Sequence, residues 1–189
     1  MTVLMLATEL AKRPVVTLAG EAVAQVKDVV FDSGGGRVGA FTLSGRGLFS
    51  GPMKQALPWS GVTGLGEDAV MIRGEEVLED RKEVVERSGP GGGDVLGARV
   101  LSDAGVELGK VTDVVIEVTR EAAAVAGYQV DSTEALGHQE RTVYLPLAGT
   151  LAISGEALLV PALAAEYVAE DLPGFAERVR AFRTRTTEA

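Results

Sequence analysis

The chain has 189 residues, no cysteine and a formal net charge of −9. Its 46% hydrophobic and 24% charged content is typical of a soluble globular protein and excludes an intrinsically disordered one. The lack of cysteine excludes disulfides and thiolate chemistry, and the negative charge argues against non-specific binding to nucleic acid or anionic lipid. No apolar run is long enough to cross a bilayer, and the short apolar N-terminus lacks the basic start of a signal peptide. We therefore expect a cytoplasmic protein without a transmembrane segment.

The first half of the chain predicts short strands separated by turns. The expected strands lie at 10–18, 23–32, 37–44, 62–65 and 69–72. Gly20 marks a tight turn and residues 33–36 a hairpin-type turn, because glycine adopts positive φ cheaply. This spacing of strands and turns indicates an all-β architecture. Residues 75–87 follow as a predicted helix, with apolar side chains at three- and four-residue steps.

The strongest feature of the sequence is an internal repeat. Val26–Asp32 reads VKDVVFD, and Val111–Glu117 reads VTDVVIE 85 residues later. Gly20 and Gly105 share this offset, and a later Leu-Pro pair recurs 88 residues on. The whole module is therefore duplicated. We predict a first domain over 1–88, a Gly/Pro-rich linker over 89–93 and a second domain over 94–189.

The end of the second domain predicts a helix. Asp171 is a candidate cap, and Pro173 falls in the first turn. Phe175, Val179 and Phe182 form one apolar stripe. The arginines at 178–185 suit the negative end of the helix dipole, so a solvated helix end is favoured over an acidic-surface or RNA contact.

The second repeat resembles the PRC-barrel domain. The residues that carry the likeness are Gly105–Ile116, GVELGKVTDVVI, with Leu145-Pro146 farther on. The first repeat matches more loosely, with Ala24-Gln25 in place of Gly109-Lys110, but it keeps Asp28-Val29-Val30 and Leu57-Pro58-Trp59. The resemblance covers nearly all of the chain and is closest to stand-alone bacterial tandem proteins. It implies a mainly β fold of two tandem small barrels, with short helical segments and a C-terminal helix.

The resemblance also implies a role, because the usual role of PRC-barrel domains is docking onto another macromolecule. They include the cytoplasmic domain of the photosynthetic reaction-centre H subunit and the C-terminal domain of a ribosome-maturation factor. The chain lacks the transmembrane helix of the former and the separate RNA-processing barrel of the latter, so neither specific function is carried over.

Two motif aspartates and one histidine are the residues that invite a chemical interpretation. Asp28 and Asp113 form a carboxylate dyad or cation site in one interpretation. In the favoured interpretation, each is a structural residue of its own motif and accepts backbone hydrogen bonds beside a turn or barrel rim. His138 is the only histidine, and its polar neighbours indicate an exposed loop. Neither a zinc site rich in histidine nor a catalytic triad is supported.

The segment 45–51, GRGLFSG, is a glycine-rich loop. It lacks the Lys-Ser/Thr ending and the following helix of a phosphate loop. Arg46, Leu48 and Phe49 have the composition of a partner-docking tip, although folding back over the barrel is the default interpretation. Trp59, the only tryptophan, is expected to pack in the core or at a barrel end.

These observations predict a non-enzymatic docking module that uses no cofactor or metal and binds a protein partner. One alternative is a ribosome- or RNA-associated assembly factor, which the net charge disfavours. Another is a peripheral membrane adaptor, which only the apolar first seven residues support. An enzyme is not expected, because no nucleophile, base and oxyanion donors converge in the sequence. Nucleic acid is not an expected partner, and self-association is left open.

Overall fold

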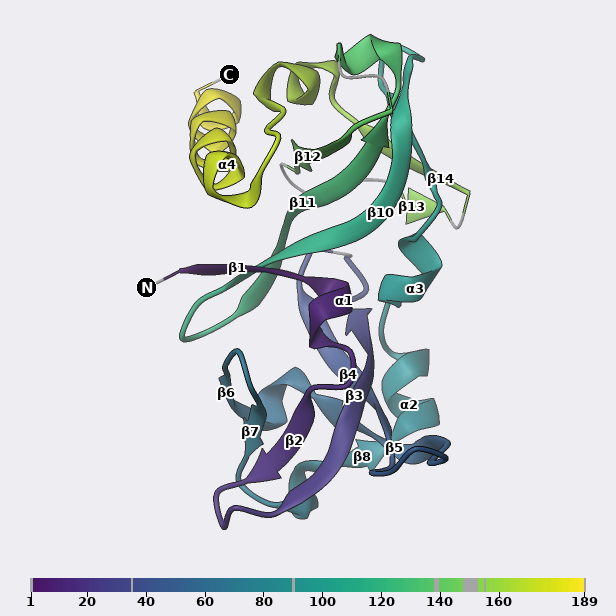
Figure 1. Ribbon diagram of the computed structural model, residues 1–189, viewed down its shortest axis with the longest axis vertical. Coiled ribbons are helices and arrows are strands. Elements are labelled where there is room, and N and C mark those ends of the chain that lie inside the picture. Colours follow the sequence, from purple (N-terminus) through teal and green to yellow (C-terminus); the bar gives the residue numbers. More distant parts are fainter. Residues whose placement is uncertain are drawn as a thin grey trace.

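The computed structural model describes residues 2–34, 36–89, 91–137, 140–147, 153–154 and 156–188. Within them, two curved seven-stranded sheets lie one above the other along the long axis of the molecule (Figure 1). In spatial order, the first sheet contains β6 (Val62–Leu65), β7 (Val70–Ile72), β2 (Pro14–Thr17), β3 (Ala22–Phe31), β4 (Val38–Ser44), β5 (Pro52–Pro58) and β8 (Glu79–Asp80). The second contains β12 (Thr142–Pro146), β11 (Ala123–Ser132), β10 (Glu107–Val118), β9 (Arg99–Ser102), β14 (Ala157–Val160) and β13 (Ile153–Ser154), with β1 (Val3–Leu6) paired to β10.

Short helices connect and flank the sheets. The α-helices are α1 (Ala7–Leu10), α2 (Arg81–Glu86), α3 (Gly92–Val95) and α4 (Leu172–Thr187). The 3-10 helices span Trp59–Gly61, Glu75–Val77, Glu134–Leu136 and Ala162–Tyr167. The predicted mainly β fold with short helices and a C-terminal helix is confirmed.

The two sheets have the same topology. The order β5-β4-β3-β2-β7-β6 in the first sheet corresponds to β12-β11-β10-β9-β14-β13 in the second. Each includes one parallel pair, β2 with β7 and β9 with β14. The turn after β2 places Gly20 at φ +86°, and the turn after β9 places Gly105 at φ +78°. The sequence repeat is therefore a repeat of the complete fold.

The repeated motif lies on β3 and β10, the longest strands of their sheets. Its valines are buried on both faces of the strand. One face is covered by the core of its own repeat, and the other is covered by segments that include the short helix at the start of the other repeat. Both strands shift register beside the motif aspartate, between Val26 and Asp28 in β3 and between Val111 and Asp113 in β10. A shift of this kind is a β-bulge, which bends a strand and re-aims a side chain.

The N-terminal segments of the repeats are exchanged. β1 precedes the first repeat in the sequence, yet it pairs with β10 of the second repeat, with Leu6 opposite Val115. The equivalent segment before the second repeat lies against β3 of the first repeat, where Gly91 bridges Val30. Both partners of the second pair lie 85 residues from those of the first. The two contacts are therefore reciprocal, and each repeat completes the other.

The stretch predicted as a linker takes part in this exchange. The Gly89 amide donates to the Phe31 carbonyl at 2.8 Å, and α3 begins at Gly92. A Cβ at Gly89 would lie 2.2 Å from the Asp32 carbonyl oxygen, so only glycine allows this close approach. These residues bind the first sheet through their backbone.

The helix predicted at 75–87 is wrong as one continuous element. Its first part, Glu75–Val77, is a 3-10 helix, Glu79 and Asp80 form β8 against Ala56 and Gln55, and only α2 is α-helical. Pairing with β5 therefore takes precedence over helical periodicity. Asp80 then caps α2 by accepting from the Glu83 amide at 3.2 Å.

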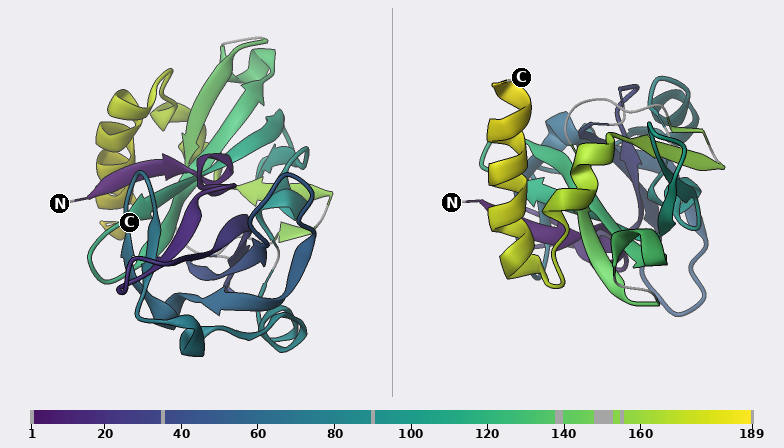
Figure 2. Two further views of the ribbon diagram at one scale, coloured as in Figure 1. Left: turned by 60° about the horizontal axis from the view of Figure 1, so that its bottom comes forward. Right: turned by 90° about the horizontal axis from the view of Figure 1, so that it is seen from above.

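The predicted C-terminal helix is confirmed as α4. Asp171 caps it by accepting from the Gly174 amide at 2.7 Å, and the predicted stripe of Phe175, Val179 and Phe182 is buried. α4 packs beside β12 and the N-terminal strand (Figure 2). The main core cluster is continuous across both repeats, since it includes Val29 of β3 and Val114 of β10.

Candidate functional site

The motif aspartate of the second repeat is bonded to the first repeat. Asp113 is only 3% exposed. Its Oδ1 accepts from the Val114 amide at 2.8 Å and from the Thr8 amide at 3.2 Å, while Oδ2 accepts from the Thr8 hydroxyl. Thr8 lies in the first turn of α1, where amides lack helical partners. The carboxylate therefore caps the helix of the other repeat.

The motif aspartate of the first repeat has the matching position. The Val29 amide donates to Asp28 Oδ1 at 2.8 Å. A Cβ at Gly91 would lie 3.3 Å from Asp28 Oδ2, which places this carboxylate at the start of α3. Both aspartates thus lie where a bulged strand of one repeat meets the short helix that leads into the other.

This geometry gives the aspartates a role in joining the repeats. Asp113 accepts hydrogen bonds from two amides and a hydroxyl, one of these amides and the hydroxyl belonging to Thr8 of the first repeat. Among the described residues, no group of three or more His, Asp or Glu side chains is arranged to hold a metal ion.

The 45–51 loop, which we call the docking loop, is held by its own backbone. Gly45 donates to the Gly51 carbonyl at 3.2 Å, and the Ser50 hydroxyl donates to the Arg46 carbonyl at 2.8 Å. Arg46 Nη1 donates to the Ala22 carbonyl at 2.7 Å, which anchors the loop to β3. The predicted loop is therefore a braced projection of the β4–β5 connection.

The side chains at the tip of the docking loop point into solvent. Leu48 is 98% exposed and Phe49 is 100% exposed, so they do not fold back over the barrel. The second repeat differs here, because the connection after β11 contains a 3-10 helix whose Leu136 is buried. His138, the other residue of interest in this connection, lies outside the described residues.

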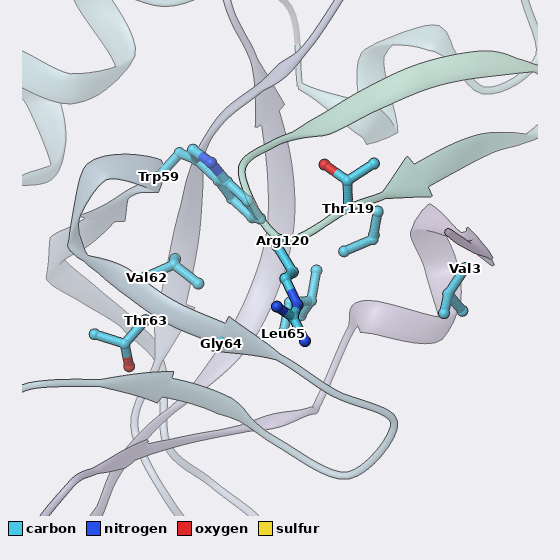
Figure 3. Close-up of a pocket in the computed structure, with 9 residues that line it drawn as sticks. Val3, Trp59, Val62, Thr63, Gly64, Leu65, Thr119 and Arg120 are labelled. Carbon is cyan, nitrogen blue, oxygen red and sulfur yellow. The ribbon is translucent and has the colours of Figure 1, made fainter. Parts of the chain in front are cut away.

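A groove lies at the junction of the two repeats and has a volume of about 290 Å³. The first repeat contributes Trp59 and all of β6, and the second contributes the turn of the β10–β11 hairpin. The lining residues are Val3, Trp59, Val62, Thr63, Gly64, Leu65, Val118, Thr119 and Arg120. In Figure 3, Trp59 stands at one end of the groove and Arg120 reaches toward Leu65.

Trp59 is half-buried and packs on Phe41 with ring centroids 6.3 Å apart. It packs against the edge of the core and also lines the groove. The contribution of Arg120 and Val3 to the groove was missed from the sequence. No local signal marks them, because the groove forms only when segments more than 50 residues apart meet.

The arginines of α4 do not act as one group. Arg183 pairs with Glu117 of β10 at 2.8 Å, whereas Arg178, Arg180 and Arg185 are exposed. The paired arginine ties α4 to the signature strand. The others are spread around the solvent side of the helix, which suits the solvated helix end predicted for this segment.

Two shifted pKa values have structural causes. Burial raises the pKa of Tyr128 from 10.0 to about 12, because a phenolate in the core would lose its hydration. A hydrogen bond from Arg99 lowers the pKa of Glu107, and the same bond raises the pKa of Arg99. Tyr128 belongs to the core, and the Arg99–Glu107 pair lies on the surface.

The family model of the PRC-barrel domain matches the chain twice, over residues 3–78 and 91–166. The second match begins at Gly91, inside the stretch predicted as a linker. No curated protein matches the chain significantly. Within the described part of the chain, no helix combines the length and apolar character that a membrane span requires.

Proposed function

The chain belongs to the PRC-barrel family, whose domains are interaction modules, and from this premise we propose that it is a non-enzymatic docking module for a partner protein. The two repeats form a rigid platform through their exchanged strands and shared core. The docking loop is the contact element that projects from this platform.

The observation that carries this proposal is the full exposure of two adjacent large apolar side chains, Leu48 and Phe49, on a braced loop. Burying such a side chain is worth about 1.5–3 kcal/mol. A loop that is already ordered loses little entropy on binding, so more of this free energy contributes to affinity. A partner with an apolar pocket would therefore gain the free energy of burying both side chains and would lose little of it to ordering the loop.

The test is a crosslinked pull-down from native lysate, with soluble, ribosomal and membrane fractions kept apart. Wild-type protein is compared with a Leu48→Ser/Phe49→Ser variant. We expect one stoichiometric protein partner in a single fraction, and about tenfold or greater loss of affinity for it in the variant, as at an interface hot spot. The measured quantity is the Kd of the purified pair.

The matched control is a Leu96→Ser/Val106→Ser variant, which removes two exposed apolar side chains from the second repeat. It should bind the partner as the wild type does. Equal loss in both variants would show that general surface hydrophobicity, and not the docking loop, causes the capture. Recovery of no macromolecule in any fraction would contradict the docking function.

The same exposed pair supports a second candidate, a peripheral adaptor at a membrane surface, with Lys54 close in sequence to supply positive charge. Sedimentation with vesicles of neutral or mixed neutral and anionic lipid tests it. Pelleting of the wild type that the Leu48→Ser/Phe49→Ser variant loses would favour this candidate over a protein partner.

A further inference from the structure

The groove at the junction of the repeats runs along the edge of a sheet. β6 stands at one end of the strand order of the first sheet and pairs on its inner side with β7. The groove is lined by all four consecutive residues of β6, from Val62 to Leu65. Side chains of neighbouring strand residues point to opposite faces, so a space that touches all four lies along the strand's edge. Backbone amides and carbonyls of β6 are therefore available to a further strand.

The walls of the groove have two chemical characters. Trp59, Val3 and Leu65 form an apolar surface on which a bulky side chain can lie. Arg120, on the hairpin turn, is exposed and makes no hydrogen bond or ion pair with any residue that the structure describes. Figure 3 shows its side chain extended along the groove beside Leu65. An unpaired guanidinium in this position is suited to a carboxylate.

The shape of the groove suits a peptide. Its volume of about 290 Å³ is at the lower end of the range of ligand pockets, roughly 300–1,000 Å³. It is sufficient for one large side chain, and the open strand edge provides the remaining binding surface. A peptide that adds a strand gains affinity from main-chain hydrogen bonds and specificity from its alternate side chains.

We propose that the groove binds an extended segment of a partner protein, which adds as a strand to the free edge of β6, lays one bulky apolar side chain on Trp59 and presents a nearby Asp or Glu carboxylate to Arg120. The groove and the docking loop share no residue. The two surfaces are therefore separate, and either proposal can fail without the other.

The experiment begins with selection of random heptapeptides displayed on phage against the intact protein. We expect the selected sequences to converge on a large apolar residue within two positions of Asp or Glu. Trp59 is the only tryptophan of the chain, so its fluorescence reports binding of each synthetic peptide. Titration then gives a Kd without any added label.

Arg120→Gln tests the charge contact. We expect this variant to bind the acidic peptides about two- to fivefold more weakly, the range for an exposed ion pair. Replacing the peptide carboxylate by an amide should weaken binding to the wild type by the same factor and should not weaken binding to Arg120→Gln. The matched control is Arg178→Gln, an exposed arginine on α4, which should bind as the wild type does.

Backbone N-methylation of the selected peptide tests strand addition. Methylation at alternate residues should abolish binding, and methylation at the residues between them should be tolerated, because only every second amide of an edge strand faces its neighbour. Failure of the selection to converge, equal binding by Arg120→Gln, or indifference to the methylated position would each overturn the proposal. So would an equal Trp59 response to 3-phenylpropionate alone, which would identify a site for small acids.

Discussion

The two repeats share their strand order but differ in what surrounds the strands. In the first repeat, α2 has six residues and covers a small cluster of Val30, Ala40, Ala56 and Val84. In the second, α4 has sixteen residues and covers a larger cluster that includes Phe175 and Val179. Both helices are capped by an aspartate that accepts from the third helical amide. The two helices therefore begin with the same kind of cap but differ in length.

The longer helix belongs to the second repeat, but the more exposed apolar loop belongs to the first. The first repeat exposes Leu48 and Phe49, whereas the equivalent connection in the second contains the buried Leu136. The strands and bulges that both repeats keep maintain the fold. The features that the repeat does not duplicate are the ones we assign to binding. They are the docking loop of the first repeat, and the groove that Trp59 of the first repeat and Arg120 of the second line together.

The largest expected effect of a single substitution concerns the clusters beneath α2 and α4. Phe175→Ala should destabilise the protein by about 3–5 kcal/mol, because it leaves a cavity above Gly127 and beside Tyr144. The equivalent change Val84→Ala should cost about 2 kcal/mol, because fewer buried atoms are removed. Urea unfolding of each variant measures the difference.

Val85→Ala is the control for this pair, because Val85 lies on the exposed side of α2. It should change the free energy of unfolding by no more than about 0.5 kcal/mol. Equal losses for Phe175→Ala and Val84→Ala would show that α4 contributes no more to stability than α2.

The next effect concerns the two motif aspartates. Asp113→Ala should cost about 3 kcal/mol, because it leaves the Thr8 amide and hydroxyl and the Val114 amide without their acceptor. Asp28→Ala should cost about half as much, because Asp28 is only half-buried and water can replace it. Urea midpoints give both values, and an unchanged m-value would show that the unfolding reaction is the same.

A double-mutant cycle with Thr8→Ala locates the effect of Asp113. Coupling of about 1–2 kcal/mol between Asp113 and Thr8 is expected if the carboxylate joins the repeats through α1. Additive losses would instead confine the role of Asp113 to its own strand. Asp68→Ala, at an exposed turn, is the neutral control.

Local patterns in the sequence predicted those elements that depend on local contacts. Gly20 and Gly105 indicated the turns, and the repeated motif indicated the long strands. Asp171 and the apolar stripe predicted α4. The exchange of β1 was not predicted, because alternating apolar residues do not identify a pairing partner more than 100 residues away. For the same reason, the stretch at 75–87 was assigned from its periodicity, although two of its residues pair with β5.

The candidate sites show the same limit. Leu48 and Phe49 were recognised from composition, but no local pattern indicates the hydrogen bond from Arg46 to the Ala22 carbonyl that anchors their loop to β3. The groove was missed because its walls come from both repeats. The motif aspartates were recognised from the repeat, and their contact with α1 and α3 depends on the exchange of N-terminal segments.

The last effect is a pH dependence that distinguishes the equivalent core residues Phe41 and Tyr128, each of which pairs in register with the central strand of its own sheet. The pKa of Tyr128 rises from 10.0 to about 12 on folding because its phenol is buried. Its contribution to stability is therefore complete below pH 10, where both states are protonated. Above pH 10 the unfolded chain loses the proton first, so stability falls by up to about 1.4 kcal/mol per pH unit until the folded state also ionises near pH 12.

Tyr128→Phe makes the second repeat like the first at this position and removes the titrating group. All other titratable groups are present in both proteins, so the difference between wild type and variant isolates Tyr128. Denaturant unfolding at pH 9 and pH 11.5 should show a steeper loss of stability for the wild type, by about 2 kcal/mol. Parallel losses would mean that water reaches the phenol in the folded protein, and that the core of the second repeat is less closed than that of the first.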